Sequence, residues 1–447
     1  MTDTAAQPST PSQGQRLYAL FVGLFLAFTL FKVGNPVILD HRFTPPQDAH
    51  QWLLFVFPSR WAMVVLVPLA VIGLALFGRF RPAAPRWLVW LPLVWFGWQC
   101  LSATQTVSRQ LTAQTLPHLG ACALCFYLAL FVLGPMRRPE RFLWGAVAGL
   151  ALLLAAGFQQ HFGGLEETRQ WIYETRGMEN LTPEMKKKLA SNRIFSQLVY
   201  PNAFAGAILL LLPLSLVWIW QISERLAIAT QWLLTLLLAA AGLGCLYWTG
   251  SKGGWLVALA MGLAASFRLS WSRRAKFAVA AAVLMLGLAG FTWKYHGYFA
   301  KGATSVGARF DYWDAAWKTA VQKPWLGSGP GTFQVVYAQL KRPDSEMARL
   351  AHNDYLEQAS DSGWIGFLAY LAFWAGSLAF LYRKSVCSPL AFAVWLGLAG
   401  WALQEMAEFG LYIPALAWPA FLLLGCLCGG GFVVDEGGAS PLESPGR

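Results

Sequence analysis

Long apolar stretches recur from one end of the chain to the other and are separated by polar connections. Most of them have roughly 17–23 residues, which matches the ~20 apolar residues that a helix needs to cross a bilayer. The pattern predicts an all-α polytopic membrane protein with about twelve transmembrane helices. The expected spans are 17–39, 61–78, 87–106, 116–136, 142–158, 202–220, 227–247, 254–268, 277–293, 363–382, 387–405 and 412–431.

The composition agrees with this fold class. Of the 447 residues, 56% are apolar and 13% are charged, whereas soluble domains are about half apolar and about a quarter charged. These values exclude a soluble enzyme, a disordered protein and a disulfide-stabilised scaffold. The net charge of +12 partly reflects the Lys and Arg that membrane proteins keep on cytoplasmic loops, so we expect membrane lipids and no nucleic acid as partners.

Basic residues in the short connections indicate the orientation of the spans. If the N-terminus is cytoplasmic, every basic cluster lies on the inner side: Arg79, Arg81, Arg86, Arg137, Arg138, Arg141, Arg225, Arg268, Arg273, Arg274, Lys276, Arg383 and Lys384. The short outer connections then hold Arg42, Arg60, Arg109 and Lys252. Both termini are therefore expected in the cytoplasm, with a disordered tail at 1–16 and a second tail at 432–447.

Two outer segments are long, at 159–201 and 294–362, and they divide the spans into groups at 17–158, 202–293 and 363–431. Long segments between membrane spans are usually functional. The first contains a short amphipathic stretch at 183–188, and the second contains helix-like stretches at 308–322 and 333–341. Their many basic residues are either tolerated, because long segments are partly exempt from the charge bias, or they form an anion site.

The segment Ala351–Gly366 carries His352 just before the tenth expected span. Helical spacing predicts that His352, Tyr355 and Leu356 share one face of a helix that leads directly into that span. A neutral imidazole at this outer face can take a proton from an acceptor hydroxyl. The alternative is a solvated histidine at a polar helix start.

Three cations are expected on the same side of the membrane as His352. Arg193 precedes the sixth span, where it can grip a phosphate or anchor a lipid headgroup. Lys252 lies in the glycine-rich turn 248–254, which can present free backbone N–H groups to an anion. Arg309 opens the helix-like stretch 308–322, and the loop 327–331 after it is either a backbone nest for an oxyanion or a rigid spacer.

Several cations and one base fit a transfer reaction that cleaves a diphosphate bond, with the charge stabilised by fixed cations. The sequence has no Asp-x-Asp pair and no phosphate-binding Gly-Lys-Ser/Thr loop. We therefore expect neither a metal ion nor a cofactor. Nucleotides are absent from the outer face, so the donor should be linked to a lipid.

The ordered motifs resemble the O-antigen ligase and O-antigen polymerase superfamily. They are His352-Asn-x-x-Leu, the run from Arg309 through Trp313 to Pro324-x-x-Gly-x-Gly, the Thr-x-Ser-Lys-Gly turn, and Pro-Asn-x-Phe-Ala after Arg193. The resemblance covers about 190–430. It implies a metal-independent, inverting glycosyltransferase of the bacterial inner membrane with a periplasmic active site. Such enzymes move a glycan from undecaprenyl diphosphate to a hydroxyl on lipid A–core, on another glycan or on a protein.

The resemblance also implies residue roles. His352 matches the general base, and Arg193 matches an arginine that binds the diphosphate. Lys252 stands where the family commonly has Arg, so it keeps the charge but loses the bidentate fork. Arg309 has a diphosphate-binding or structural role. Further substrate contacts are expected from four residues of the same motifs: Gln197, Asn202, Asn353 and Tyr355.

These motifs do not separate a ligase that uses lipid A–core from an O-antigen or exopolysaccharide polymerase with the same donor. The compact outer segment with one His-bearing helix favours the ligase. A lipid or saccharide transporter is a rival, for which Glu405 and Glu408 near the outer end of the eleventh span are the features to cite, although one of them can instead pair with a cation of the site. A structural assembly subunit is the third alternative.

Overall fold

A computed structural model describes residues 12–42, 46, 51–52, 55–136, 140–177, 179, 181, 186, 189–268, 271–300, 304–385 and 388–432. Within these ranges the chain forms helices and loops without a β-strand. Apart from residue 186, the amphipathic stretch expected at 183–188 lies outside the described residues, as do most of the two expected tails.

The first half of the chain contributes α1 (Gln13–Lys32), η1 (Val37–Arg42), α3 (Ser59–Phe77), α4 (Arg86–Ala103), α5 (Arg109–Leu128), η2 (Ala129–Leu133), α6 (Glu140–Gln159), η3 (Gln160–Gly164) and α7 (Leu165–Arg176). The second half contributes α9 (Pro201–Ile222), α10 (Ile228–Thr249), α11 (Lys252–Ser266), α12 (Arg273–Ala300), α13 (Thr304–Gln322), α14 (Phe333–Leu340), α15 (Asp354–Ser385), α16 (Pro389–Gln404), η4 (Gly410–Tyr412) and α17 (Pro414–Cys428).

Each of the twelve apolar stretches coincides with one of these helices. Among the described residues, eight helices are long and apolar enough to cross a membrane, and α16 and α17 are shorter apolar helices. The fold is thus all-helical and fits a polytopic membrane protein. The count of twelve crossings and the cytoplasmic termini remain predictions.

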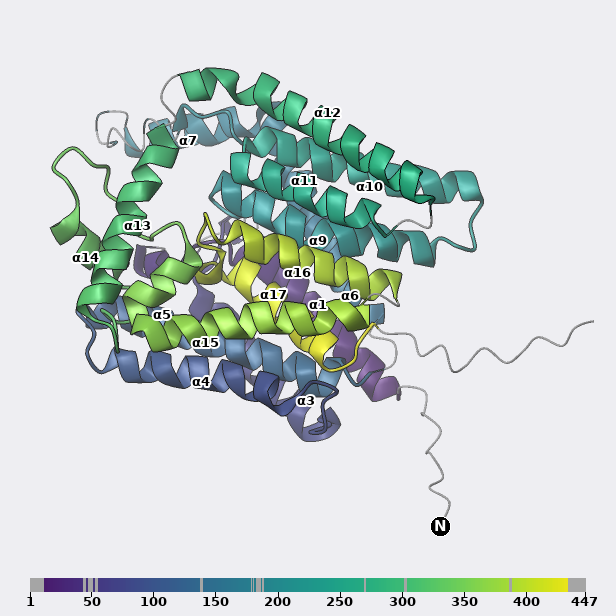
Figure 1. The fold of residues 1–447 in the computed structure, drawn as a ribbon, viewed down its shortest axis with the longest axis horizontal. Helices are drawn as coiled ribbons and strands as arrows, with labels where there is room; N and C mark the ends of the chain where they lie inside the picture. Colours follow the sequence, from purple (N-terminus) through teal and green to yellow (C-terminus); the bar gives the residue numbers. More distant parts are fainter. Residues whose placement is uncertain are drawn as a thin grey trace, which may run out of the picture.

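Helix α17 occupies the centre of the bundle (Figure 1), where it packs on α1, α5 and α16. Every residue of this helix is buried, as expected for a helix that is apolar on all sides. Around it, α1 and α6 approach each other very closely at Gly23 and Gly145. A Cβ atom on Gly145 would collide with the backbone of Gly23. Small residues commonly allow such close approach between membrane helices.

The two long segments that were predicted to be outer lie at the same end of the bundle, where α13 runs across the ends of the long helices and packs on α15 (Figure 1). Several helix ends differ from the predicted spans. Helix α1 ends at Lys32 rather than at 39, α5 begins at Arg109 rather than at 116, and α12 continues beyond residue 293 to Ala300. Helix α15 begins at Asp354, so it combines the span expected from 363 with most of the helix that was predicted to lead into it.

The first turns of α15 are separated from the rest by Gly363, whose φ of 69° is readily adopted only by glycine. This break lets the Trp364 N–H donate to the Pro324 carbonyl at 2.8 Å.

Candidate active site

His352 lies in the bend just before α15, not on the helix as the spacing predicted. The first helical residue is Asp354, because Asn353 caps the helix by accepting a hydrogen bond from the Leu356 N–H at 3.0 Å. His352 itself has a φ of 52°, which is uncommon for a residue with a side chain. Glu357 holds the preceding residue by accepting from the Ala351 N–H at 2.8 Å.

The imidazole of His352 lies between two aromatic rings and one carboxylate. It stacks on Tyr312 at 5.8 Å between ring centroids and meets the edge of Phe409 at 4.7 Å. Its Nδ1 atom is 3.6 Å from Oε2 of Glu408 and has no hydrogen-bond partner. With 30% of the side chain exposed, the ring is fixed in position and can still be reached by a substrate.

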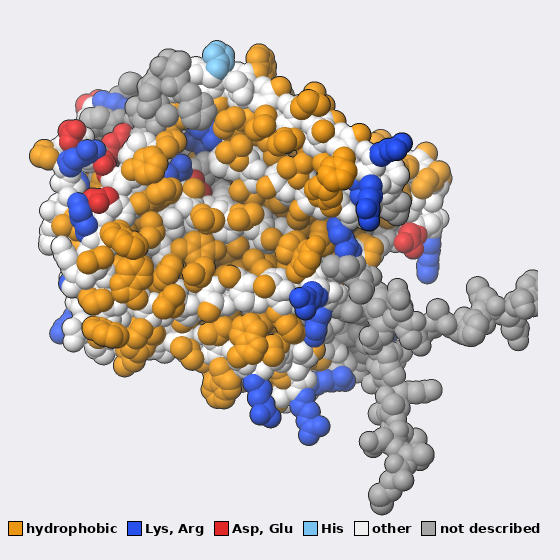
Figure 2. Space-filling model, viewed as in Figure 1, with side chains coloured by type: hydrophobic (Ala, Val, Ile, Leu, Met, Phe, Trp, Pro, Cys, Tyr) orange, Lys and Arg blue, Asp and Glu red, His pale blue; other side chains and the backbone are white. Residues whose placement is uncertain are grey.

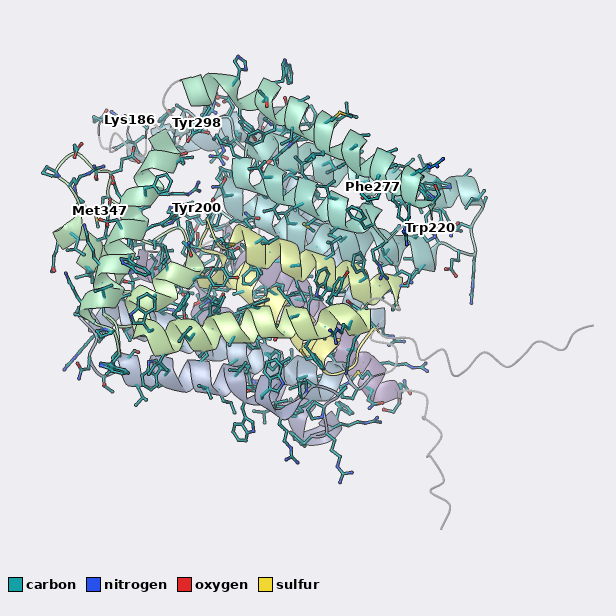
Figure 3. All side chains as sticks on the ribbon, viewed as in Figure 1. Lys186, Tyr200, Trp220, Phe277, Tyr298 and Met347 are labelled. Carbon is teal, nitrogen blue, oxygen red and sulfur yellow. The ribbon has the colours of Figure 1, made fainter. Side chains whose placement is uncertain are left out.

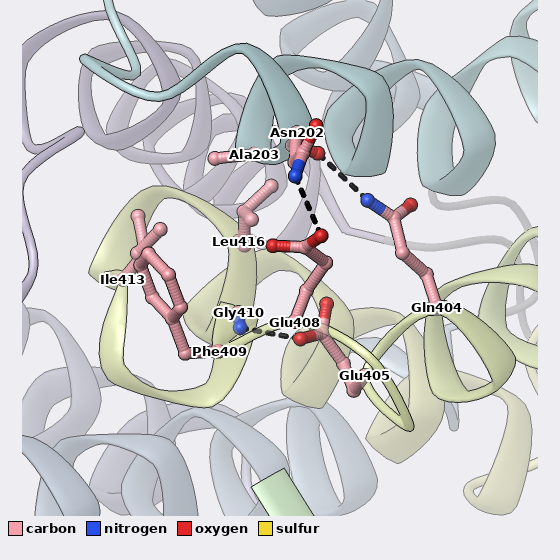
Figure 4. Close-up of a pocket in the computed structure, with 9 residues that line it drawn as sticks. All are labelled: Asn202, Ala203, Gln404, Glu405, Glu408, Phe409, Gly410, Ile413 and Leu416. Carbon is pink, nitrogen blue, oxygen red and sulfur yellow. Dashed lines mark hydrogen bonds between the residues drawn. The ribbon is translucent and has the colours of Figure 1, made fainter. Parts of the chain in front are cut away.

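Glu408 connects the predicted site residues to one another. Its Oε1 atom accepts hydrogen bonds from Asn202 Nδ2 at 2.6 Å and from the Arg309 guanidinium. Figure 4 shows it with Asn202, Gln404 and Glu405 around a small pocket. The sequence offered Glu408 only as a transporter feature or as a partner of a cation, and the structure shows the second.

Arg193 lies on the segment between α7 and α9, and its side chain is close to Arg309, Lys252 and Lys294. Its Nε donates to the Thr249 carbonyl at 2.6 Å, and its NH2 group donates to Oδ1 of Asn202 at 2.5 Å. Burial lowers the pKa of Arg193, whereas the negative charge of Glu408 raises it. An arginine that has lost much of its hydration gains more from a bound anion than an exposed one does.

The Arg193 segment is held by side chains on both of its flanks. On one side, Arg169 donates to the carbonyls of Leu189 and Ser191, at 2.6 and 3.0 Å. On the other side, Oε1 of Gln160 accepts from the backbone N–H groups of Phe195 and Ser196, at 3.0 and 2.7 Å. Gln160 begins the π-helical turn η3, a feature that occurs frequently at functional sites.

Lys252 begins α11 and extends toward aromatic rings of α12. Its Nζ lies 3.7 Å from the ring centroid of Tyr298 and 5.3 Å from that of Tyr295. Burial, followed by the positive charges of Arg193 and Arg309, lowers the pKa of Lys252 to about 8. The ammonium group is therefore close to other cations.

Lys294 adds a fourth cation that the sequence analysis did not identify, because the expected span ended at residue 293. It lies on the part of α12 that continues beyond this point, and its Nζ donates to the Tyr247 carbonyl. Lysine and arginine side chains and a few carboxylates are visible in the recess beside α13 in Figure 2, and Tyr298 and Tyr200 lie at this end of the bundle in Figure 3.

The other predicted contacts have structural partners. Tyr355 donates to the Ala402 carbonyl at 3.0 Å and so joins α15 to α16. Asn353 caps α15, and Gln197 approaches Gly34 closely with its backbone carbonyl. Roles of these three residues in substrate binding remain predictions.

Buried carboxyl groups of α15 fix the loops around the site. Asp354 accepts from the Leu411 N–H at 2.7 Å and holds the turn that follows Glu408. Asp361 accepts from the Gly331 N–H at 2.6 Å. The loop 327–331 thus donates a backbone N–H to the protein's own Asp361, and its role as an anion nest or as a rigid spacer remains a prediction.

Arg309 and His352 thus lie at Glu408, Arg193 is joined to the same carboxylate through Asn202, and Lys252 and Lys294 lie near Arg193. The arrangement suits an anionic substrate that is attacked by a nucleophile deprotonated at His352, since fixed cations stabilise the charge of a leaving group.

A comparison with protein families finds one relevant match, and a comparison with curated proteins finds none. The family model is described as O-antigen ligase and matches residues 233–371. The matched segment runs from α10 into α15 and includes Lys252, Arg309 and His352. This match confirms, through the domain at 233–371, the resemblance of the chain to the O-antigen ligase and polymerase superfamily.

Proposed function

We propose that this protein is an O-antigen ligase-like glycosyltransferase. It moves a glycan from undecaprenyl diphosphate to a hydroxyl of lipid A–core at the periplasmic face of the bacterial inner membrane. The observation that carries the proposal is the meeting of His352 and Arg309 at Glu408, with Arg193 joined to the same carboxylate through Asn202. The match of residues 233–371 to the O-antigen ligase family supports it.

In the proposed reaction, His352 acts as the general base. If Nδ1 carries the proton that faces Glu408, the Nε2 lone pair is free to accept the proton of the acceptor hydroxyl. The acceptor oxygen then bonds to the anomeric carbon of the glycan while the bond from that carbon to the diphosphate oxygen breaks. Attack from the face opposite the leaving group inverts the configuration.

The cations stabilise the diphosphate as it leaves. Arg193 and Arg309 can each donate two N–H groups to phosphate oxygens, and Lys252 adds a point charge. No step of this mechanism uses a metal ion. Asn202 orients Arg193, because its Oδ1 accepts from that guanidinium while its Nδ2 donates to Glu408.

The proposal is tested with purified protein, an undecaprenyl diphosphate-linked glycan and a lipid A–core acceptor, without added metal. His352→Ala and Arg193→Ala should each abolish transfer in a protein that remains folded and inserted in the membrane. Glu224→Gln, an exposed residue in the turn after α9, serves as the control and should transfer normally. Full activity in both alanine variants would overturn the assigned roles.

A polymerase with the same donor is equally compatible with this site, and the product distinguishes the two. A ligase extends lipid A–core, whereas a polymerase lengthens the lipid-linked glycan. The transporter alternative loses its supporting features, because Glu408 pairs with Arg309 and Glu405 accepts from the Gly410 N–H. A transporter would move the donor across vesicles without forming a new glycosidic bond.

A further inference from the structure

The end of α12 places an unpaired hydroxyl group among the cations of the site. Tyr295 is 6% exposed, and its hydroxyl oxygen is buried without a hydrogen-bond partner. The Nζ atoms of Lys252 and Lys294 lie 5.3 and 5.7 Å from its ring centroid. Buried polar groups are nearly always hydrogen-bonded, and an unpaired hydroxyl on a ring that two ammonium groups approach is well placed to donate to an anion.

The cations of the site fall into two groups with different partners. Arg309 is paired with Glu408, and Arg193 is linked to the same carboxylate through Asn202. Lys252 and Lys294 lie over tyrosine rings instead, and in the described part of the chain neither has a carboxylate within ion-pair distance. Their positive charges are therefore less compensated than those of the two arginines.

The two groups also differ in their surroundings. His352 is on the arginine side, 3.6 Å from Glu408. Lys294 and Tyr295 belong to α12, a helix that packs mainly on α11. Only 6% of the apolar stretch of α12 is buried inside the protein. Apolar side chains cover this face of the molecule in Figure 2, so α12 adjoins the lipid of the bilayer.

We propose that the site separates the two phosphates of its donor. Lys252, Lys294 and the Tyr295 hydroxyl bind the phosphate that carries the polyprenyl chain. Arg193 and Arg309 bind the phosphate attached to the sugar. This inference rests on the proposed function and extends it to the subsites.

If the donor binds as proposed, the reaction itself requires the sugar-linked phosphate on the arginine side and the lipid-linked phosphate on the lysine side. The sugar-linked phosphate must lie near His352, because its bond to the anomeric carbon breaks as the acceptor attacks that carbon. The lipid-linked phosphate must lie where the polyprenyl chain can enter the bilayer, which is the α12 side. When the donor binds, the two lysine side chains move from the tyrosine rings to the phosphate, and the Tyr295 hydroxyl donates to it.

Two lipids that differ by one phosphate test this division. Undecaprenyl phosphate has only the lipid-linked phosphate, whereas undecaprenyl diphosphate has both. Binding of each lipid is measured on the purified full-length protein in nanodiscs. Tyr295→Phe keeps the ring beneath Lys252 and removes only the hydroxyl, so it should weaken the binding of both lipids about ten-fold, the effect of losing one hydrogen bond to a charged group. Lys294→Gln should do the same.

Arg309→Gln should weaken the diphosphate about ten-fold and leave undecaprenyl phosphate within about two-fold of the wild-type value. The control is Tyr382→Phe, which removes a hydroxyl from a half-exposed ring that packs on Trp395 far along α15. It should change neither affinity. Thermal unfolding of each variant verifies that the protein is folded.

The division is wrong if Tyr295→Phe and Lys294→Gln leave both affinities unchanged, or if Arg309→Gln weakens both lipids equally. The proposed function survives either result as long as the wild-type protein transfers glycan from the diphosphate donor. If the wild-type protein neither binds the diphosphate nor transfers glycan, the proposed function fails and the division fails with it.

Discussion

Replacement of Glu408 by glutamine is the sharpest perturbation of the site. Glu408 is buried and accepts from Asn202 and Arg309 with one oxygen while its other oxygen faces His352. Glutamine keeps the shape and one acceptor oxygen but removes the negative charge. Glutamine therefore loses the ion pair with Arg309. Its NH₂ group, which can only donate, faces either the His352 imidazole or the Arg309 guanidinium, and the guanidinium also only donates.

The expected loss follows from the bonds involved. A hydrogen bond to a charged group contributes about 1.5–3 kcal/mol, and each 1.36 kcal/mol in a transition-state barrier corresponds to about ten-fold in rate. If Glu408 holds both Arg309 and His352 in their reactive positions, Glu408→Gln should lower the rate of glycan transfer about 10²-fold. Glu408→Asp restores the charge with a shorter side chain and should recover part of this loss.

The assay is single-turnover transfer from the undecaprenyl diphosphate donor, measured together with donor affinity and thermal stability. A general structural role would lower stability and affect aspartate and glutamine variants alike. A positioning role lowers the transfer rate in a folded protein and depends on the charge. A Glu408→Gln protein that transfers at the wild-type rate, or an aspartate variant no better than glutamine, would refute the reasoning.

Two further predictions concern the cations. Because the pKa of Lys252 is lowered to about 8, transfer should decline as the pH rises through this value and Lys252 becomes neutral. Lys252→Arg remains charged and should extend activity to higher pH, so identical alkaline limbs in a pH–rate profile would contradict the role of this lysine. Gln160→Ala releases the backbone N–H groups of Phe195 and Ser196 and should raise the KM for the donor about ten-fold by loosening the Arg193 segment. An unchanged KM would show that Arg169 alone holds this segment.

The sequence predicts the helices of this protein well because their signal is local. Each apolar stretch is long and continuous, and every one coincides with a helix. The helix start at Asp354 was also readable in principle, since Asn353 is a favoured N-cap residue. The helical spacing placed the start at His352 and the apolar stretch began at 363, so neither signal gave this boundary.

The contacts of the site were harder to predict because they join distant parts of the chain. Arg309 and Glu408 are 99 positions apart, and Asn202 and Glu408 are 206 positions apart. A single sequence contains no direct signal for such pairs. The cations could be placed on one side of the membrane from topology, but the carboxylate that organises them could not be distinguished from other acidic residues at helix ends.

The charges at this end of the bundle also support the proposed binding of an anionic donor. Burial lowers the pKa of Arg193 and of Lys252, which means that the folded protein keeps these cations partly desolvated at a cost in free energy. Glu408 pairs with Arg309, whereas Lys252 and Lys294 have no carboxylate within ion-pair distance among the described residues. An entering diphosphate supplies the missing negative charge in a region with little water, where its interaction with fixed cations is strongest. Under the proposed function, the same charges that oppose folding of the empty site favour the bound donor and the developing negative charge of the leaving group.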